Sequence, residues 1–82
     1  MSEPTDYASL PYTKCFVPED EGGYSCYVKE LHGCLSQGET LMEAYENLTV
    51  AMANWIEAAR SQRQEIPLPD TDFWPRTKKQ AG

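Results

Sequence analysis

Cys34 and His32 are the two side chains whose types and spacing could support nucleophilic catalysis. In an extended segment residues i and i+2 lie on one face, so an imidazole could accept the thiol proton. Gly33 interrupts this segment, however, and no third side chain that would orient the imidazole is evident. A surface histidine beside a cysteine that packs as a small apolar residue explains the pair better. We therefore predict no catalytic residue.

The acidic run Glu19-Asp20-Glu21 and the Gly22-Gly23 pair after it are the next candidates, for a metal ion or a phosphate. A hard cation needs carboxylate oxygens that converge, whereas three adjacent side chains at a loop tip mostly diverge. A phosphate loop needs a Gly-Lys-Ser/Thr ending at a helix N-terminus, which this segment lacks. The segment is typical of a solvated hairpin loop, and no metal or cofactor is predicted.

The three cysteines, Cys15, Cys26 and Cys34, contain no Cys-x-x-Cys pair, and a zinc site would need ligands at such short spacing. Their expected role is apolar packing in a reducing compartment. The alternative is a disulfide between Cys15 and Cys26 across a hairpin, which would need oxidising conditions.

Length and charge restrict the function classes. The 82-residue chain has a net charge of −6 and is large enough for one small domain, for which a partner or self-association is expected. Residues 1–65 hold eleven acidic and four basic side chains, a balance that repels nucleic acid and attracts basic proteins. No apolar run approaches the ~20 residues of a membrane span, and the polar start MSEPTDY has no signal-peptide pattern. A cytoplasmic protein without membrane or direct nucleic-acid contact is expected.

Three short segments are predicted to form strands. Residues 12–17 (YTKCFV) are rich in β-branched and aromatic residues, Pro18 ends them, and the glycine-containing loop leads into residues 24–31 (YSCYVKEL). Residues 34–37 (CLSQ) allow a short third strand. Alternation in the second strand predicts a core-facing set, Tyr24, Cys26, Val28 and Glu30, and an outer set, Ser25, Tyr27, Lys29 and Leu31.

A long amphipathic helix is predicted from residue 41 to about residue 62. Thr40 and Glu43 form a capping box, in which the hydroxyl accepts from an N–H of the first turn and the carboxylate reaches back to the cap. An apolar stripe at helical spacing is expected to be buried: Leu41, Tyr45, Leu48, Met52 and Trp55.

The expected fold is α+β, an antiparallel sheet of three to four strands with one long helix packed on one face. Residues 1–11 are expected to form a flexible lead-in, residues 12–69 the domain and residues 70–82 a short tail. Residues 70–75 (DTDFWP) are the candidate fourth strand.

The order of these motifs resembles the HicB family of antitoxins, in particular its partial RNase H-like domain. The similar stretches are EDEGGYSCYV (19–28), ELHGC (30–34), SQGETLMEAYENL (36–48) and EIPLP (65–69). The resemblance implies the partial RNase H-like fold. It does not imply nuclease activity, because a fold alone does not determine function. It also implies a partner, a HicA-type toxin, which is a small basic ribonuclease that cleaves mRNA and that the antitoxin binds and occludes.

Two features depart from the family pattern. Lys29 and His32 stand where the family usually has proline. Only 13 residues follow Pro69 in the chain of 82, so the DNA-binding domain that many family members carry at the C-terminus is not expected.

The residues expected to contact the toxin lie in the acidic loop and on the outer face of the second strand: Glu19, Asp20, Glu21, Tyr27, Lys29 and Leu31. A homo-oligomer, most simply a dimer, is also expected, because Tyr27 and Leu31 on the outer face and Phe73 and Trp74 in the tail are apolar. The alternative function is a stand-alone oligomeric module that binds another protein or a ligand and has no toxin partner.

Overall fold

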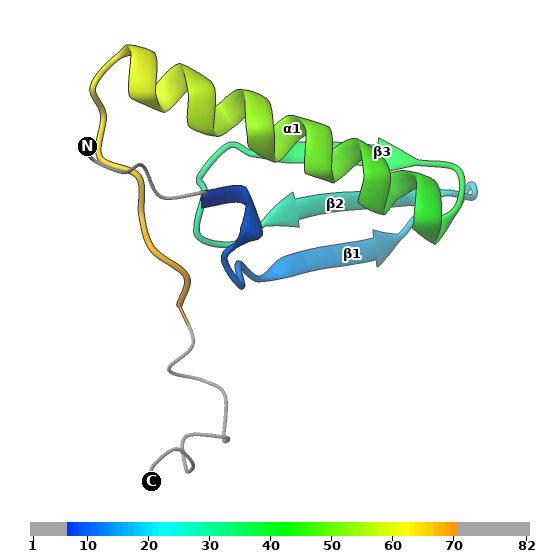
Figure 1. Cartoon of the computed structure of the whole chain (residues 1–82). Coiled ribbons are helices and arrows are strands. Elements are labelled where there is room, and N and C mark those ends of the chain that lie inside the picture. The colour runs from blue at the N-terminus through cyan, green and yellow to red at the C-terminus, as the bar shows by residue number, and fades with distance from the viewer. Residues whose placement is uncertain (1–6, 71–82) are drawn as a thin grey trace, which may run out of the picture.

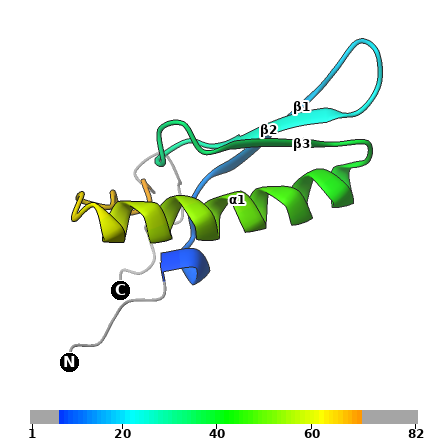
Figure 2. The same cartoon turned by 90° about the horizontal axis from the view of Figure 1, so that it is seen from above.

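The computed structural model describes residues 7–70, which form a three-stranded antiparallel sheet with one long helix across it. A 3-10 helix, η1 (Tyr7–Ser9), precedes β1 (Lys14–Pro18), β2 (Tyr24–Val28) and β3 (Leu35–Gly38), and α1 (Leu41–Ser61) follows (Figure 1). Helix and sheet form two layers, and no other element of the described chain lies on the far face of the sheet (Figure 2). The predicted α+β fold is confirmed with three strands. The candidate fourth strand, including Phe73 and Trp74, falls outside the described residues except for its first position.

Two consecutive hairpins build the sheet, in the order β1-β2-β3. The first turn closes with hydrogen bonds from the Gly22 N–H to the Glu19 carbonyl oxygen and from the Glu19 N–H to the Gly23 carbonyl oxygen, both 3.0 Å. Gly22 and Gly23 have φ angles of 102° and 81°, which glycine adopts without the steric cost of a side chain. The glycine pair therefore serves the hairpin, as the sequence predicted.

The second strand is shorter than predicted, and this changes the side on which Leu31 lies. β2 ends at Val28, and in the tight turn that follows the Leu31 N–H donates to the Val28 carbonyl oxygen (3.2 Å). Because the two-residue alternation of a strand stops there, position 31 no longer belongs to the outer face. The Leu31 side chain is 0% exposed and part of the core, so its predicted place on the outer face was wrong.

The buried side of α1, which packs mainly over β3 and β2, is rotated from the predicted stripe. Leu48 and Met52 are buried as predicted, but Leu41 and Tyr45 are about half exposed, at 51% and 47%, and Trp55 is only partly buried. The buried helix residues are Ala44, Leu48, Met52, Ile56 and Ala59.

Close approach between α1 and β3 at Gly38 explains this rotation. A Cβ atom at Gly38 would lie 2.3 Å from the backbone nitrogen of Ala44, so the two backbones are nearly in contact. An alanine fits at this point and a tyrosine does not. Tyr45 therefore lies to the side, where its ring packs against Phe16 with centroids 6.4 Å apart.

The helix begins at the predicted cap. The Glu43 N–H donates to the Thr40 hydroxyl oxygen (3.1 Å), which satisfies one of the free N–H groups of the first turn. The Glu43 carboxylate accepts from the Glu39 N–H (2.6 Å), one residue further back than a capping box requires.

After α1 the chain turns back, and residues 66–70 run along the end of the sheet near η1 (Figure 1). The Tyr12 hydroxyl donates to the Pro67 carbonyl oxygen (2.6 Å), and Ile66 packs against the core. This extended segment therefore connects the C-terminal part of the described chain to the residues just before β1.

Candidate functional site

The face of the sheet opposite α1 is left uncovered by the fold (Figure 2). Directly opposed residues of an antiparallel pair point to the same side, so the strand register identifies the side chains on this face. Cys15 pairs with Tyr27 and Tyr27 with Leu35, and two positions along, Val17 pairs with Ser25 and Ser25 with Gln37. The uncovered face thus consists of two rows, Cys15-Tyr27-Leu35 and Val17-Ser25-Gln37.

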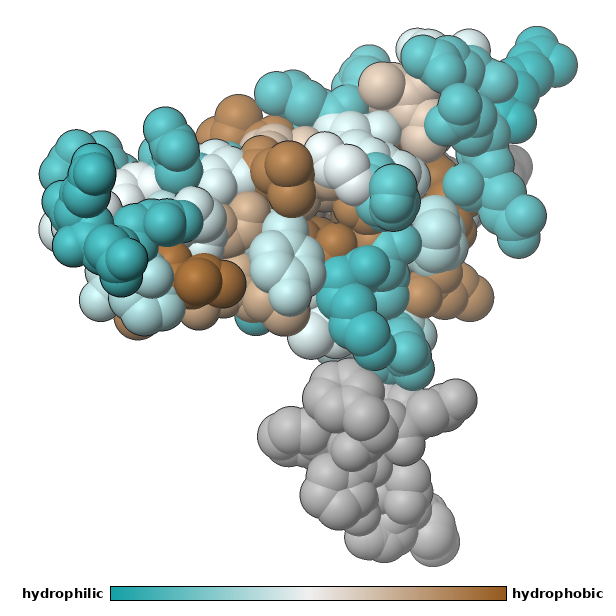
Figure 3. Space-filling model, turned by 180° about the vertical axis from the view of Figure 1, so that it is seen from behind, coloured by the Kyte–Doolittle hydropathy of each residue, from teal (hydrophilic) through white to brown (hydrophobic). Residues whose placement is uncertain are grey.

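The first of these rows, Cys15, Tyr27 and Leu35, is apolar and accessible, and we refer to it as the apolar row. Tyr27 is 40% exposed and Leu35 66% exposed, and a hollow of about 340 Å³ lies beside them between β2 and β3. The neighbouring Cys15 thiol raises the pKa of the Tyr27 phenol above its ordinary value. Figure 3 shows hydrophobic surface over this side of the sheet. Exposed apolar side chains in a continuous row make this face a candidate interaction site.

The acidic loop at the end of the β1–β2 hairpin borders the uncovered face. Glu19, Asp20 and Glu21 are all exposed, as the sequence predicted for a solvated loop. The Glu19 carboxylate accepts a hydrogen bond from the Ser25 hydroxyl of the uncovered face, so the loop is attached to the sheet. In Figure 3 the hairpin tip is strongly hydrophilic, next to the hydrophobic surface of the sheet. Negative charge and apolar surface are therefore adjacent.

Lys29 and Leu31, the other two residues predicted to contact a partner, have different surroundings. The Lys29 ammonium forms an ion pair with Asp70 (2.9 Å), and both side chains are about half exposed. The carboxylate of Asp70 raises the pKa of Lys29. Leu31 is buried beneath the turn and cannot reach a partner while the domain is folded. The structure thus places the acidic loop and Tyr27 on the same side of the sheet, with one row of side chains between them. Lys29 lies at the other end of β2, and Leu31 is not part of the surface.

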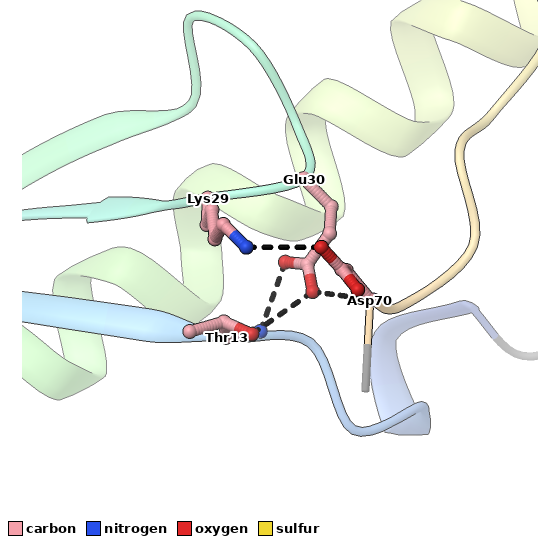
Figure 4. A network of polar contacts seen from close by, with 4 residues as sticks. All are labelled: Thr13, Lys29, Glu30 and Asp70. Carbon is pink, nitrogen blue, oxygen red and sulfur yellow. Dashed lines mark hydrogen bonds and ion pairs between the residues drawn. The ribbon is translucent and has the colours of Figure 1, made fainter. Parts of the chain in front are cut away.

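Glu30 is the centre of a polar network that the sequence pattern did not reveal (Figure 4). Its carboxylate accepts from the Thr13 N–H and the Thr13 hydroxyl, both at 2.9 Å, and from the Asp70 N–H at 2.7 Å. Burial alone would raise the pKa of Glu30, but these hydrogen bonds outweigh it and hold the pKa below its ordinary value of 4.5. The signal available in the sequence was a glutamate at a position expected to face the core.

The positions of the cysteines disfavour both catalysis by Cys34 and a disulfide between Cys15 and Cys26. Cys34 is 2% exposed, and burial raises the pKa of its thiol, whereas a nucleophilic cysteine needs a lowered pKa. His32 is exposed, and its carbonyl oxygen accepts from the Trp55 indole N–H (3.0 Å). Cys15 lies on the uncovered face and Cys26 in the core, so the strand alternation keeps these two thiols on opposite sides.

Residues 7–70 contain no group of three or more His, Cys, Asp or Glu side chains arranged to hold a metal ion. Within the same residues, no helix has the length and hydrophobicity needed to span a membrane.

An uncovered apolar sheet face beside an acidic loop is typical of a protein-binding module. Comparison with known families identifies the family to which the chain belongs. A model described as the HicB_like antitoxin of bacterial toxin-antitoxin system matches residues 12–73, most of the chain. The chain therefore belongs to the HicB-like antitoxin family.

Individual relatives agree with this assignment. The UPF0150 protein ssl0259 of Synechocystis sp. is 39% identical over 58 residues, which cover 71% of this chain and 80% of that protein. The UPF0150 protein Ta0767 of Thermoplasma acidophilum is 33% identical over 58 residues, covering 71% and 84%. Among solved structures, a chain of a HicA3 and HicB3 toxin-antitoxin complex matches with a TM-score of 0.64 and 25% identity, covering 83% of this chain and 78% of that one.

Proposed function

We propose that this protein binds a HicA-type toxin, a small basic mRNA-cleaving ribonuclease, and prevents it from reaching RNA. The observation that carries the proposal is that the apolar row and the acidic loop lie on one side of the sheet, with only the row Val17-Ser25-Gln37 between them. Membership of an antitoxin family supports it, as does the similarity to a chain solved in a toxin-antitoxin complex. The binding residues proposed are Glu19, Asp20, Glu21 and Tyr27, with Lys29 at the margin.

The two parts of this surface have different physical roles. Carboxylates of the loop occupy the places of RNA phosphates opposite the toxin's Lys and Arg side chains, and such exposed charges act mainly on the association rate. The apolar row is desolvated by contact, and a central aromatic side chain such as Tyr27 then slows dissociation. The protein acts by occlusion in the cytosol and does no chemistry of its own.

We also propose that the chain forms a homo-oligomer, most simply a dimer. The alternative function, a stand-alone oligomeric module that binds another protein or a ligand, uses the same uncovered face. The two functions differ in whether a toxin exists. A gene for a short basic protein next to the gene for this chain would favour the antitoxin.

The direct experiment expresses that neighbouring short basic protein with and without this chain and measures growth and mRNA cleavage. Arrested growth and cleaved mRNA are expected for the basic protein alone, with both reversed by this chain. A variant with Glu19, Asp20 and Glu21 changed to Gln, Asn and Gln should associate more slowly and show a weaker salt dependence. Glu46→Gln, on the exposed side of α1, is the matched control. Full protection by a protein altered in both the loop and Tyr27 would refute this binding surface.

A further inference from the structure

β1 is an edge strand whose outward hydrogen-bonding groups have no partner among residues 7–70. The Thr13 carbonyl oxygen accepts from the Lys29 N–H (2.9 Å), and the Glu19 N–H donates to the Gly23 carbonyl oxygen (3.0 Å). Because the direction of these groups alternates along a strand, the odd-numbered residues of β1 face β2. The N–H and C=O groups of Lys14 and Phe16 therefore point away from the sheet. Such an edge is a template for a further strand.

β3 is the opposite edge of the sheet and is better protected. The Val28 N–H donates to the Cys34 carbonyl oxygen (3.1 Å), so Leu35 and Gln37 direct their backbone groups outward. The Asn47 side chain of α1 donates to the Gln37 carbonyl oxygen (2.7 Å) and occupies part of that edge. α1 also lies mainly over β3 and β2, which leaves β1 the least covered strand.

We propose that two copies of this chain join through their β1 edges, antiparallel about a two-fold axis at Cys15, to form one six-stranded sheet. This inference rests on the self-association proposed above and locates its interface. In this register Lys14 lies opposite Phe16 of the second copy, and every outward N–H meets an outward C=O. An axis at Phe16 would instead place Pro18, which has no N–H, opposite Lys14 and leave both Lys14 carbonyl oxygens unpaired.

A second copy fits this edge because the resulting assembly closes. Pairing uses each β1 edge once, and Pro18 limits the strand to a short segment, so the contact produces a dimer and not a fibre. Antiparallel pairing directs the two acidic loops to opposite ends of the joined sheet, which keeps these charges apart. On the helix side it covers Phe16 and the ring of Tyr45, which is 47% exposed with the Lys14 ammonium 5.9 Å from its centroid.

The same pairing joins the apolar rows of the two copies. The order across the sheet becomes Leu35, Tyr27, Cys15 and then Cys15, Tyr27, Leu35 of the second copy. The proposed toxin-binding surface would thus be continuous across the dimer. The two Cys15 residues form a non-hydrogen-bonded pair with Cα atoms about 4.5 Å apart, which lies within the range of about 4.4–6.8 Å that a disulfide bridges.

This proximity gives the first test. The reduced full-length protein, without toxin, is treated with copper-phenanthroline as oxidant and resolved on a non-reducing gel, and the linked peptides are identified by mass spectrometry. A dimer linked through Cys15 of both copies is expected, because Cys26 and Cys34 are each 2% exposed. Cys15→Ser should abolish it. No link, or a link through Cys26 or Cys34 that persists in Cys15→Ser, would overturn the proposed register.

The second test removes the edge hydrogen bonds without touching the sheet. Lys14→Pro eliminates an outward N–H in each copy, and sedimentation should show dimer dissociation at least about tenfold stronger, since two hydrogen bonds are lost. Lys14→Ala keeps the N–H and should have a much smaller effect. Circular dichroism and thermal unfolding establish that both variants fold.

The possible outcomes distinguish a wrong interface from an absence of self-association. A dimer whose dissociation constant is unchanged in a folded Lys14→Pro variant refutes the β1 interface but not self-association. A monomer at high micromolar concentration refutes both. Neither result bears on toxin occlusion, because no toxin is present in either measurement.

Discussion

The two faces of the sheet are built from the same strands and similar residue types, yet only one of them is buried. On the helix side of β2, Cys26 and Val28 are each 2% exposed, while Tyr27 between them is 40% exposed on the other side. The difference lies in what covers each face and not in hydrophobicity. One face is closed by α1, which approaches β3 closely, and the other has no covering element within residues 7–70. Substitutions on the two faces should therefore separate stability from binding.

The largest expected effect is on the covered face. Leu48→Ala removes a side chain that is 0% exposed and should lower the free energy of unfolding by about 2–5 kcal/mol, as for other large-to-small core substitutions. Leu35→Ala, with 66% exposure on the uncovered face, is the matched control and should cost within about 0.5 kcal/mol. Urea unfolding of both variants gives the comparison. Equal losses of unfolding free energy in the two variants would mean that the covered and uncovered faces contribute equally to stability.

The next effect concerns the contact that sets the position of the helix. Gly38→Ala places a Cβ atom 2.3 Å from the Ala44 backbone nitrogen, which forces α1 and β3 apart. A loss of about 1–3 kcal/mol of unfolding free energy is expected for such overpacking. Gly33→Ala is the control, because a Cβ atom there meets nothing within 4 Å and only the strain of its positive φ of 87° remains. Urea unfolding of both variants gives the comparison. If the helix could shift without cost, Gly38→Ala would lower the free energy of unfolding no more than Gly33→Ala does.

These contacts show what the sequence could and could not predict. The strands, the hairpin glycines, the Thr40 cap and the presence of one long helix follow from local signals, because turn residues and hydrophobic periodicity act over a few residues. The rotation of the helix does not, because it depends on Gly38 meeting Ala44 across the fold. Periodicity alone favoured Tyr45, the larger residue, as the core position.

The candidate site was predictable to a similar degree. The acidic loop and the outward direction of Tyr27 follow from the hairpin and from strand alternation. The burial of Leu31 does not, because it depends on where β2 ends. The network around Glu30 does not either, because it depends on the return of residues 66–70, a contact between segments 40 positions apart.

An effect of similar size to that of Gly38→Ala is expected at the end of the sheet, where Glu30 joins β1, the turn after β2 and the returning segment. Glu30→Gln replaces one of the two acceptor oxygens by an NH2 group. That group then faces either the Thr13 N–H, or the Asp70 N–H and the Thr13 hydroxyl, and can accept from neither N–H, so a loss of about 1–3 kcal/mol at pH 7 is expected. Thermal unfolding measures it, with Glu46→Gln as control.

The pH dependence sharpens this prediction. The folded-state pKa of Glu30 lies below its ordinary value of 4.5, so its contribution to stability is present above about that pH and is lost as the pH falls through the folded pKa. Stability of the native protein should therefore decrease on acidification below pH 4.5 more steeply than that of Glu30→Gln. Parallel pH profiles of the two proteins would contradict this role for Glu30.

The smallest effect on stability, and the one that tests the comparison most directly, is expected for Tyr27→Ala. The side chain is 40% exposed and lies on the uncovered face, so the free energy of unfolding should change little, within about 0.5 kcal/mol for a surface substitution. If that face binds the toxin, loss of the central aromatic side chain should nevertheless speed dissociation of the complex by at least about tenfold, the effect of losing an interface residue worth more than 1.4 kcal/mol. Surface-bound toxin and this chain in solution would give the rate directly, with Tyr24→Ala, on the helix side of the same strand, as the inverse control that destabilises the fold. A Tyr27→Ala protein that unfolds early and releases the toxin at the native rate would show that the uncovered face supports the fold and not the partner.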